Sequence, residues 1–137
     1  MHKDRGKKLK MGPIWDLNIA YGNSSRVPVD DWIANYNSYV PNDAWLVPFW
    51  WKKLLEDPVF KSALKVRWQV LRSNVLSNSS IINLIDDTSK YLIDNGAIER
   101  NYNRWTGIPV DYSGAVNNLK SYLNSRLLWI DSKTNEF

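Results

Sequence analysis

The sequence predicts an α+β fold that is mostly α-helical, with an N-terminal β-hairpin packed on about four helices. The chain has 137 residues, the size of one ordinary domain, and 44% hydrophobic with 23% charged residues is a typical globular balance. From residue 43 onward, apolar side chains recur at helical spacing. We therefore expect a single domain over residues 1–137, with a hairpin in 1–23 and a helical region in 43–131.

The first segment has the pattern of two short strands joined by a turn. Asp4-Arg5-Gly6-Lys7 is typical of a hairpin turn, with a glycine for positive φ. Residues 14–21 are apolar except for Asp16 and Asn18. Side chains two residues apart on a strand point to the same face, so we expect these two polar groups to lie together.

The next segment, residues 22–41, is rich in asparagine, serine, proline and aspartate and predicts a long loop. Loops of this length inside a compact domain are often functional or lid-like. We expect Trp32, Ile33, Tyr36 and Tyr39 to pin it to the body of the protein.

The helical region begins with two helices separated by a capping signal. The first is predicted over 44–55, where Pro48 lies in the first turn or marks a break. Asp57-Pro58 combines a capping side chain with proline at the first helical position, and it predicts the start of the second.

Two further helices follow. Asn78-Ser79-Ser80 is expected to cap the first of them, which Gly96 either kinks or ends. Asp111 or Ser113 starts the last helix, and residues 131–137 are expected to fray.

Composition excludes several classes of function. The chain has no cysteine and one histidine, which excludes disulfide scaffolds, thiol catalysis, serine–histidine triads and cysteine–histidine zinc sites. No apolar run approaches the roughly 18 residues of a membrane-spanning helix. Residues 1–10 carry the whole net charge of +4, whereas a nucleic-acid-binding protein spreads basic residues over a face of the fold. We therefore expect no nucleic-acid partner.

Asp16 stands out because an ionised carboxylate in so apolar a run is costly to bury without a cation or hydrogen-bond donors. A divalent metal prefers carboxylate and amide oxygens, so Asp16 and Asn18 are candidate metal ligands. The alternative is an aspartate that accepts hydrogen bonds from the backbone in a turn. Spacing alone leaves both interpretations open.

Aromatic and basic side chains raise two further alternatives. Eight tryptophans suggest either a carbohydrate-binding module or aromatic packing in the core. Five arginines on the predicted helices either bind a phosphate or form structural pairs with carboxylates of the protein. Two of them, Arg100 and Arg104, lie one helical turn apart and could reach the same acidic group. The five are Arg67, Arg72, Arg100, Arg104 and Arg126.

Several motifs together resemble a known family. Residues 11–23, Met-Gly-Pro-Ile-Trp-Asp-Leu-Asn-Ile-Ala-Tyr-Gly-Asn, are similar to the GPxWDxDxAxGN signature of the spore-coat protein H (CotH) kinase family. Residues 51–72, with Asp57-Pro58 and Arg67-Trp68, resemble the helical carboxyl-terminal portion of that family, as do residues 100–105 and 112–131. The resemblance covers nearly the whole chain.

This resemblance implies part of an atypical protein-kinase C-lobe. Such a kinase uses ATP with Mg²⁺ or another divalent metal to phosphorylate serine on a protein substrate, and the family favours an extracellular, cell-surface or coat-associated location. Asp16 matches the aspartate that holds metal against the phosphates. Asn18 replaces the second aspartate of the signature and is a weaker ligand.

The same comparison implies that this chain does not catalyse alone. None of its six glycines forms a glycine-rich phosphate loop, and the catalytic aspartate of the kinase template is expected before Met1. We therefore expect the carboxyl-terminal part of a longer kinase, with no catalytic residue in this fragment. The alternatives are a non-catalytic protein-binding relative and a tryptophan-rich carbohydrate module. The oligomeric state stays open.

Overall fold

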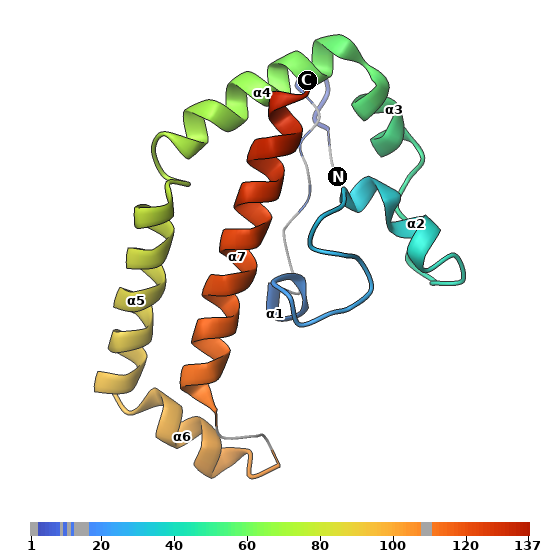
Figure 1. Ribbon diagram of the computed structural model, residues 1–137. Coiled ribbons are helices and arrows are strands. Elements are labelled where there is room, and N and C mark those ends of the chain that lie inside the picture. Colours follow the sequence, from blue (N-terminus) through green and yellow to red (C-terminus); the bar gives the residue numbers. More distant parts are fainter. Residues whose placement is uncertain (1–2, 9, 11, 13–16, 108–110) are drawn as a thin grey trace.

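The computed structural model describes residues 3–8, 10, 12, 17–107 and 111–137, and over these residues the protein is a set of helices around one long helix (Figure 1). The helices, in chain order, are α1 (Leu17–Ala20), the 3₁₀ helix η1 (Ile33–Asn35), α2 (Tyr36–Tyr39), α3 (Trp50–Glu56), α4 (Pro58–Arg72), α5 (Asn78–Asp94), α6 (Ala97–Arg104) and α7 (Tyr112–Asn135).

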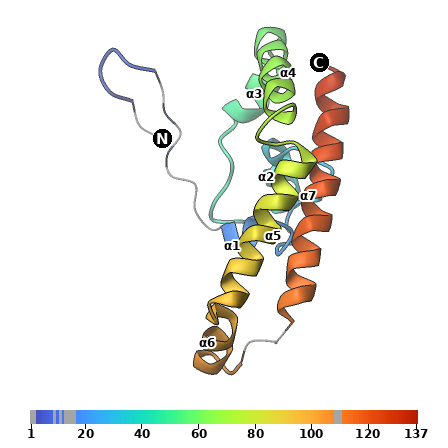
Figure 2. The ribbon, with the colours of Figure 1, turned by 90° about the vertical axis from the view of Figure 1, so that its left-hand side faces the viewer.

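The predicted N-terminal β-hairpin is wrong, and the fold is helical rather than α+β. The turn itself is present, because the Lys7 N–H donates to the Asp4 carbonyl at 3.0 Å and Gly6 has a φ of 72°. Apart from a single bridge residue at Lys10, however, the described residues contain no strand, and residues 17–20 form α1. The turn lies away from the helices (Figure 2). A two-stranded hairpin without a third strand or a packed face is only marginally stable in water. The turn and strand pattern of the sequence was therefore insufficient to predict a hairpin.

The helix starts that rest on capping side chains are confirmed. The Asp57 carboxylate accepts from the backbone N–H groups of Val59 and Phe60, and Pro58 is the first residue of α4. The preceding helix is shorter than predicted, because α3 begins at Trp50 instead of residue 44. Pro48 lacks an N–H and restricts the residue before it, and the first turn is closed by the Trp51 N–H on the Pro48 carbonyl at 3.1 Å.

Side-chain caps also start α5 and α7, whereas α6 begins after a glycine without such a cap. Ser77, just before the predicted cap, accepts from the Ser80 N–H and starts α5. Gly96 ends that helix in the left-handed conformation with a φ of 64°, so that α6 is a separate helix. Of the two candidate starts of α7, the structure selects Asp111, whose carboxylate accepts from the Gly114 N–H.

Helix α7 is the long central helix and packs against α4 and α5 (Figure 1). A polar network joins α4 to α7: Asp131 accepts from Trp68 Nε1 at 2.7 Å and from Arg72 Nε at 2.9 Å and Nη2 at 2.9 Å. The Arg72 side chain is 18% exposed and that of Asp131 33%, so water screens this pair only in part.

The C-terminal residues were expected to fray, but they are helical up to Asn135 and contact the rest of the protein. Thr134 is the most buried side chain described, at 2% exposure, and its hydroxyl donates to the Ile130 carbonyl at 2.8 Å. The Phe137 ring stacks on Trp32 with the ring centres 5.9 Å apart, and Lys65 Nζ donates to its carboxyl-terminal oxygen at 3.0 Å. Helix α7 therefore continues to Asn135 and helps to hold the segment around Trp32.

Candidate functional site

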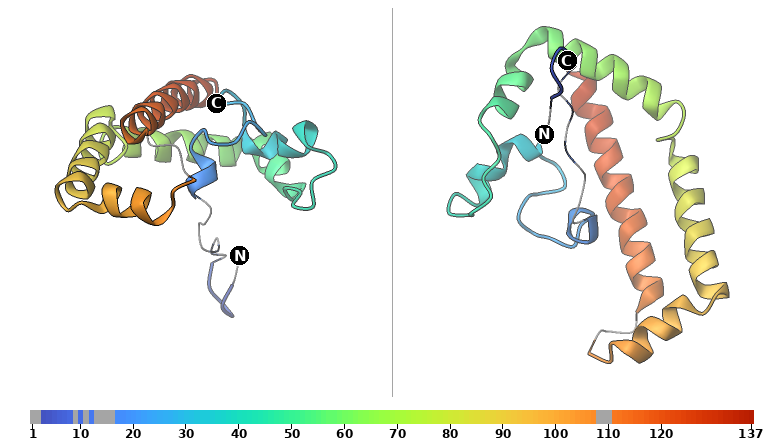
Figure 3. Two further views of the ribbon diagram at one scale, coloured as in Figure 1. Left: turned by 90° about the horizontal axis from the view of Figure 1, so that it is seen from below. Right: turned by 180° about the vertical axis from the view of Figure 1, so that it is seen from behind.

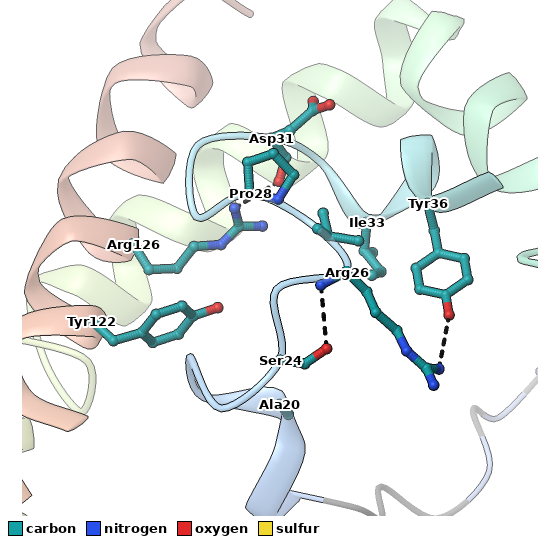
Figure 4. A pocket seen from close by; sticks show the side chains of 10 residues that line it. Ala20, Ser24, Arg26, Pro28, Asp31, Ile33, Tyr36, Tyr122 and Arg126 are labelled. Atoms are coloured by element: carbon teal, nitrogen blue, oxygen red, sulfur yellow. Dashed lines mark hydrogen bonds between the residues drawn. The ribbon is translucent and has the colours of Figure 1, made fainter. Parts of the chain in front are cut away.

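A cavity of about 420 Å³ opens between α1, the segment that follows it and α7 (Figure 4). Figure 4 shows side chains from both parts of the chain around this cavity, with Arg126 and Tyr122 coming from α7. The side chains around it are Ala20, Ser24, Arg26, Val27, Pro28, Asp31, Ile33, Tyr36, Tyr122 and Arg126. The cavity therefore lies beside the helix that directly follows Asp16 in sequence.

Arg126 ties the two walls of the cavity together. Its Nη1 donates to the carbonyls of Val29 and Asp31, both at 2.6 Å, and its guanidinium lies 4.6 Å from the centre of the Trp129 ring. Burial lowers the pKa of Arg126, although a guanidinium remains charged at any physiological pH. No carboxylate within the described residues forms an ion pair with it, so backbone carbonyls, an aromatic face and the more distant charges of Asp31 and Asp30 balance its charge.

A second polar cluster holds the opposite wall. The Tyr36 hydroxyl donates to Asp43 Oδ2 at 2.7 Å, and Arg26 Nη1 lies 3.0 Å from the same oxygen. The hydrogen bond from Tyr36, followed by that from the Trp45 N–H, lowers the pKa of Asp43 and keeps it ionised. This cluster fixes the position of Arg26 at the rim of the cavity.

Asp31 organises the turn between these walls. It accepts from the Tyr39 hydroxyl at 2.5 Å, from Asn35 Nδ2 at 2.8 Å and from the Trp32 N–H at 2.7 Å. Burial alone would raise the pKa of Asp31, but the hydrogen bonds outweigh burial, with Tyr39 first, and the pKa is lowered. The predicted long loop is therefore a folded segment that contains η1 and α2. Of the residues expected to pin it, Trp32 packs edge-on against Trp129 with the ring centres 4.7 Å apart.

Gly22 lets the chain pass close to α7. Its φ of 89° suits glycine, and a Cβ at this position would lie 2.7 Å from the Tyr122 ring. The glycine of the Ala-x-Gly-Asn motif at 20–23 thus has a steric role beside the cavity.

The two predicted metal ligands are not tested by this geometry. Asp16 lies outside the described residues, and of Asn18 only the backbone position in α1 is described. The strand on which Asn18 was expected to lie is not formed, because residues 17–20 are helical. Within the described part of the chain, no group of three or more histidine, cysteine or acidic residues is placed to hold a metal ion.

The predicted arginines have mostly structural roles. Arg72 pairs with Asp131, Arg100 Nη1 donates to the Asn95 carbonyl at 2.7 Å, and Arg104 stacks on the ring of the neighbouring Trp105 at 4.7 Å. Among the described residues Arg100 and Arg104 share no acid. Only Arg126 reaches the cavity, where it is joined by Arg26, which the sequence did not single out.

The sequence also missed the acidic and hydroxyl groups of this site. Asp31, Asp43 and Tyr122 looked like ordinary loop and helix residues. A usable signal was the run of tyrosine and aspartate between 30 and 43, since such groups order a loop when they hydrogen-bond to one another.

The comparison with known proteins bears on these observations. A family model described as CotH kinase protein matches residues 1–130. The chain belongs to the CotH kinase family. The resemblance drawn from the motifs is thereby confirmed. No curated protein and no solved structure matches the chain significantly.

Membership of the CotH kinase family relates the chain to protein kinases. The family implies a protein substrate and a general dependence on nucleotide and metal. None of the described helices is long and apolar enough to cross a membrane. The match includes both the motif at 12–23 and the helices that build the cavity.

Proposed function

We propose that this chain is the carboxyl-terminal part of a CotH-like kinase that transfers phosphate from ATP to serine on a protein substrate. The family match over residues 1–130 carries the proposal, because it spans the Trp15-Asp16 motif together with the helical region. In phosphoryl transfer the protein acts mainly by positioning groups and by electrostatic stabilisation. One metal-binding carboxylate can therefore be decisive.

In this proposal Asp16 is the metal ligand and Asn18 a weaker, neutral one. A bound divalent metal would neutralise phosphate charge as the phosphoryl group leaves. The cavity beside α1 forms part of the wall on the substrate side, where Arg26 and Arg126 provide positive charge and Tyr122 a hydroxyl. By themselves, the 137 residues lack a glycine-rich phosphate loop and do not catalyse transfer.

The test uses the longer protein that carries this chain. Asp16→Ala should abolish serine phosphorylation and weaken Mn²⁺ binding, measured by electron paramagnetic resonance in the absence of nucleotide. Asp94→Ala is the matched control, because Asp94 pairs with Lys90 on the exposed face of α5. Near-normal turnover in Asp16→Ala would refute the assignment of Asp16. Robust phosphorylation by the 137-residue chain alone would refute its predicted incompleteness.

Asn18 favours one second candidate, a non-catalytic relative that binds proteins, because the amide replaces the second acid of the signature. Asn18→Asp separates the two. In a working kinase this change should strengthen Mn²⁺ binding and preserve or raise turnover. A longer protein that binds no nucleotide in the presence of metal, with either residue at position 18, would favour the non-catalytic candidate.

A further inference from the structure

The chain exposes more surface than a compact protein of its size. Its accessible surface is 10521 Å², whereas a folded monomer of 16.0 kDa exposes about 7,400 Å². The excess is roughly 3,100 Å², several times the ~800 Å² that each partner buries in a standard protein interface. Among the described residues only Ala34, Leu127 and Thr134 are buried.

One part of this exposed surface has a regular pattern, the outward face of α4. Val59, Val66 and Val70 are 77%, 59% and 53% exposed, and Ala63 between them is exposed as well. We call these four residues the α4 stripe. Their spacing of four, three and four residues is that of the seam of a two-stranded coiled coil, and it runs for about 17 Å along the helix. A shallow groove lies over them, and α4 runs along the edge of the molecule (Figure 3).

The opposite face of α4 is already occupied. It carries Trp68 and Arg72, which contact Asp131 of α7. The α4 stripe therefore does not belong to the packing between α4 and α7. A solvent-exposed row of valines at this spacing is typical of a helix that lacks a partner.

The charge of α4 indicates which partner fits. The helix contains four basic residues and no acidic one. Three of the four have contacts within the chain: Lys61 lies over the Phe137 ring, Lys65 donates to the C-terminal carbonyls and Arg72 pairs with Asp131. Arg67 borders the groove, is exposed, and has no ion pair or hydrogen bond within the described residues.

We propose that the α4 stripe binds an amphipathic helix of a protein partner whose apolar seam is flanked by glutamate or aspartate. The apolar seam would cover the four stripe residues, and a flanking carboxylate would pair with Arg67. A second copy of this chain fits poorly, because two packed stripes would bring Arg67 from each copy to the seam and no acidic residue of α4 to pair with it. This inference concerns a different surface from the cavity and does not depend on phosphoryl transfer.

The test uses the longer protein that carries this chain and two fluorescein-labelled peptides of three heptads. Both carry leucine at positions a and d, and they carry either glutamate or lysine at e and g. Fluorescence anisotropy should show that the glutamate peptide binds at least about tenfold more tightly than the lysine peptide. Arg67→Glu should reverse this preference, whereas Arg5→Glu changes the net charge equally in the distant turn and should leave it intact.

A second pair of variants tests the apolar contact. Val66→Ser should weaken binding of the glutamate peptide about tenfold, and Val75→Ser, at 60% exposure in the loop after α4, should not. Far-UV circular dichroism checks that each variant folds. The inference is overturned if neither peptide binds, if both bind equally, or if Val66→Ser has no effect. It is also overturned if sedimentation velocity shows a dimer that Val66→Ser dissolves, since a second copy would then occupy the stripe.

Discussion

The network between α4 and α7 gives the sharpest prediction for stability. Asp131→Ala removes the acceptor of three N–H groups, one from Trp68 and two from Arg72. Breaking an exposed ion pair costs up to about 1 kcal/mol and breaking a buried one about 3–5 kcal/mol. With side chains 18% and 33% exposed, this pair lies between those limits. Arg72 also keeps two other acceptors, the Leu76 carbonyl and Asn78 Oδ1.

We therefore expect Asp131→Ala to lower the free energy of unfolding by about 2–3 kcal/mol. For a chain of this length that corresponds to a melting temperature lower by roughly 10 °C. Asp131→Asn retains one acceptor oxygen and should cost about half as much. The measurement is urea denaturation followed by tryptophan fluorescence, with thermal melting by circular dichroism as a second probe.

The matched control is Glu136→Ala, which removes an exposed ion pair with Lys133 near the end of the same helix. It should cost less than about 0.5 kcal/mol. A cycle that combines Trp68→Phe with Asp131→Asn should give a coupling energy of about 1 kcal/mol. If Asp131→Ala is no more destabilising than Glu136→Ala, the network does not hold α4 on α7 and the reasoning fails.

Three further predictions concern the cavity. Gly22→Ala should cost about 1–3 kcal/mol in urea denaturation, because its φ is positive and a Cβ would meet Tyr122, whereas Gly107→Ala, with no atom within 4 Å of its Cβ, should be neutral. Arg126→Met keeps the length of the side chain but removes the Nη1 group that donates to both carbonyls, so amide hydrogen exchange in residues 27–36 should accelerate at least about tenfold, and unchanged exchange would contradict that anchoring role. Asp31 has a lowered pKa in the folded protein, so its contribution to stability is full above the ordinary value of 3.8 and is lost as the pH falls through the lower folded value. Asp31→Asn should thus destabilise at pH 7 and progressively less below pH 4, and a pH-independent difference would refute this.

The confirmed parts of the sequence reading depend on short-range chemistry. Asp57-Pro58 and Asp111 start helices because a carboxylate and the N–H groups that it caps lie within three residues of each other. Gly96 ends a helix because only its own φ has to change. The family resemblance likewise followed from contiguous motifs, and the match over residues 1–130 confirmed it.

What failed, or was not visible, depends on partners distant in sequence. A strand over residues 14–21 needs a neighbouring strand. The described part of the chain offers none, and residues 17–20 form a helical turn. Arg126 meets carbonyls that lie 95 and 97 residues earlier, and Arg72 meets a carboxylate 59 residues later. No local pattern encodes these pairs, because each forms only when α7 packs against the rest of the chain. The amino-acid order thus determined the capped starts of α4 and α7 and the family to which the protein belongs, whereas tertiary packing decided which charged groups meet around the cavity.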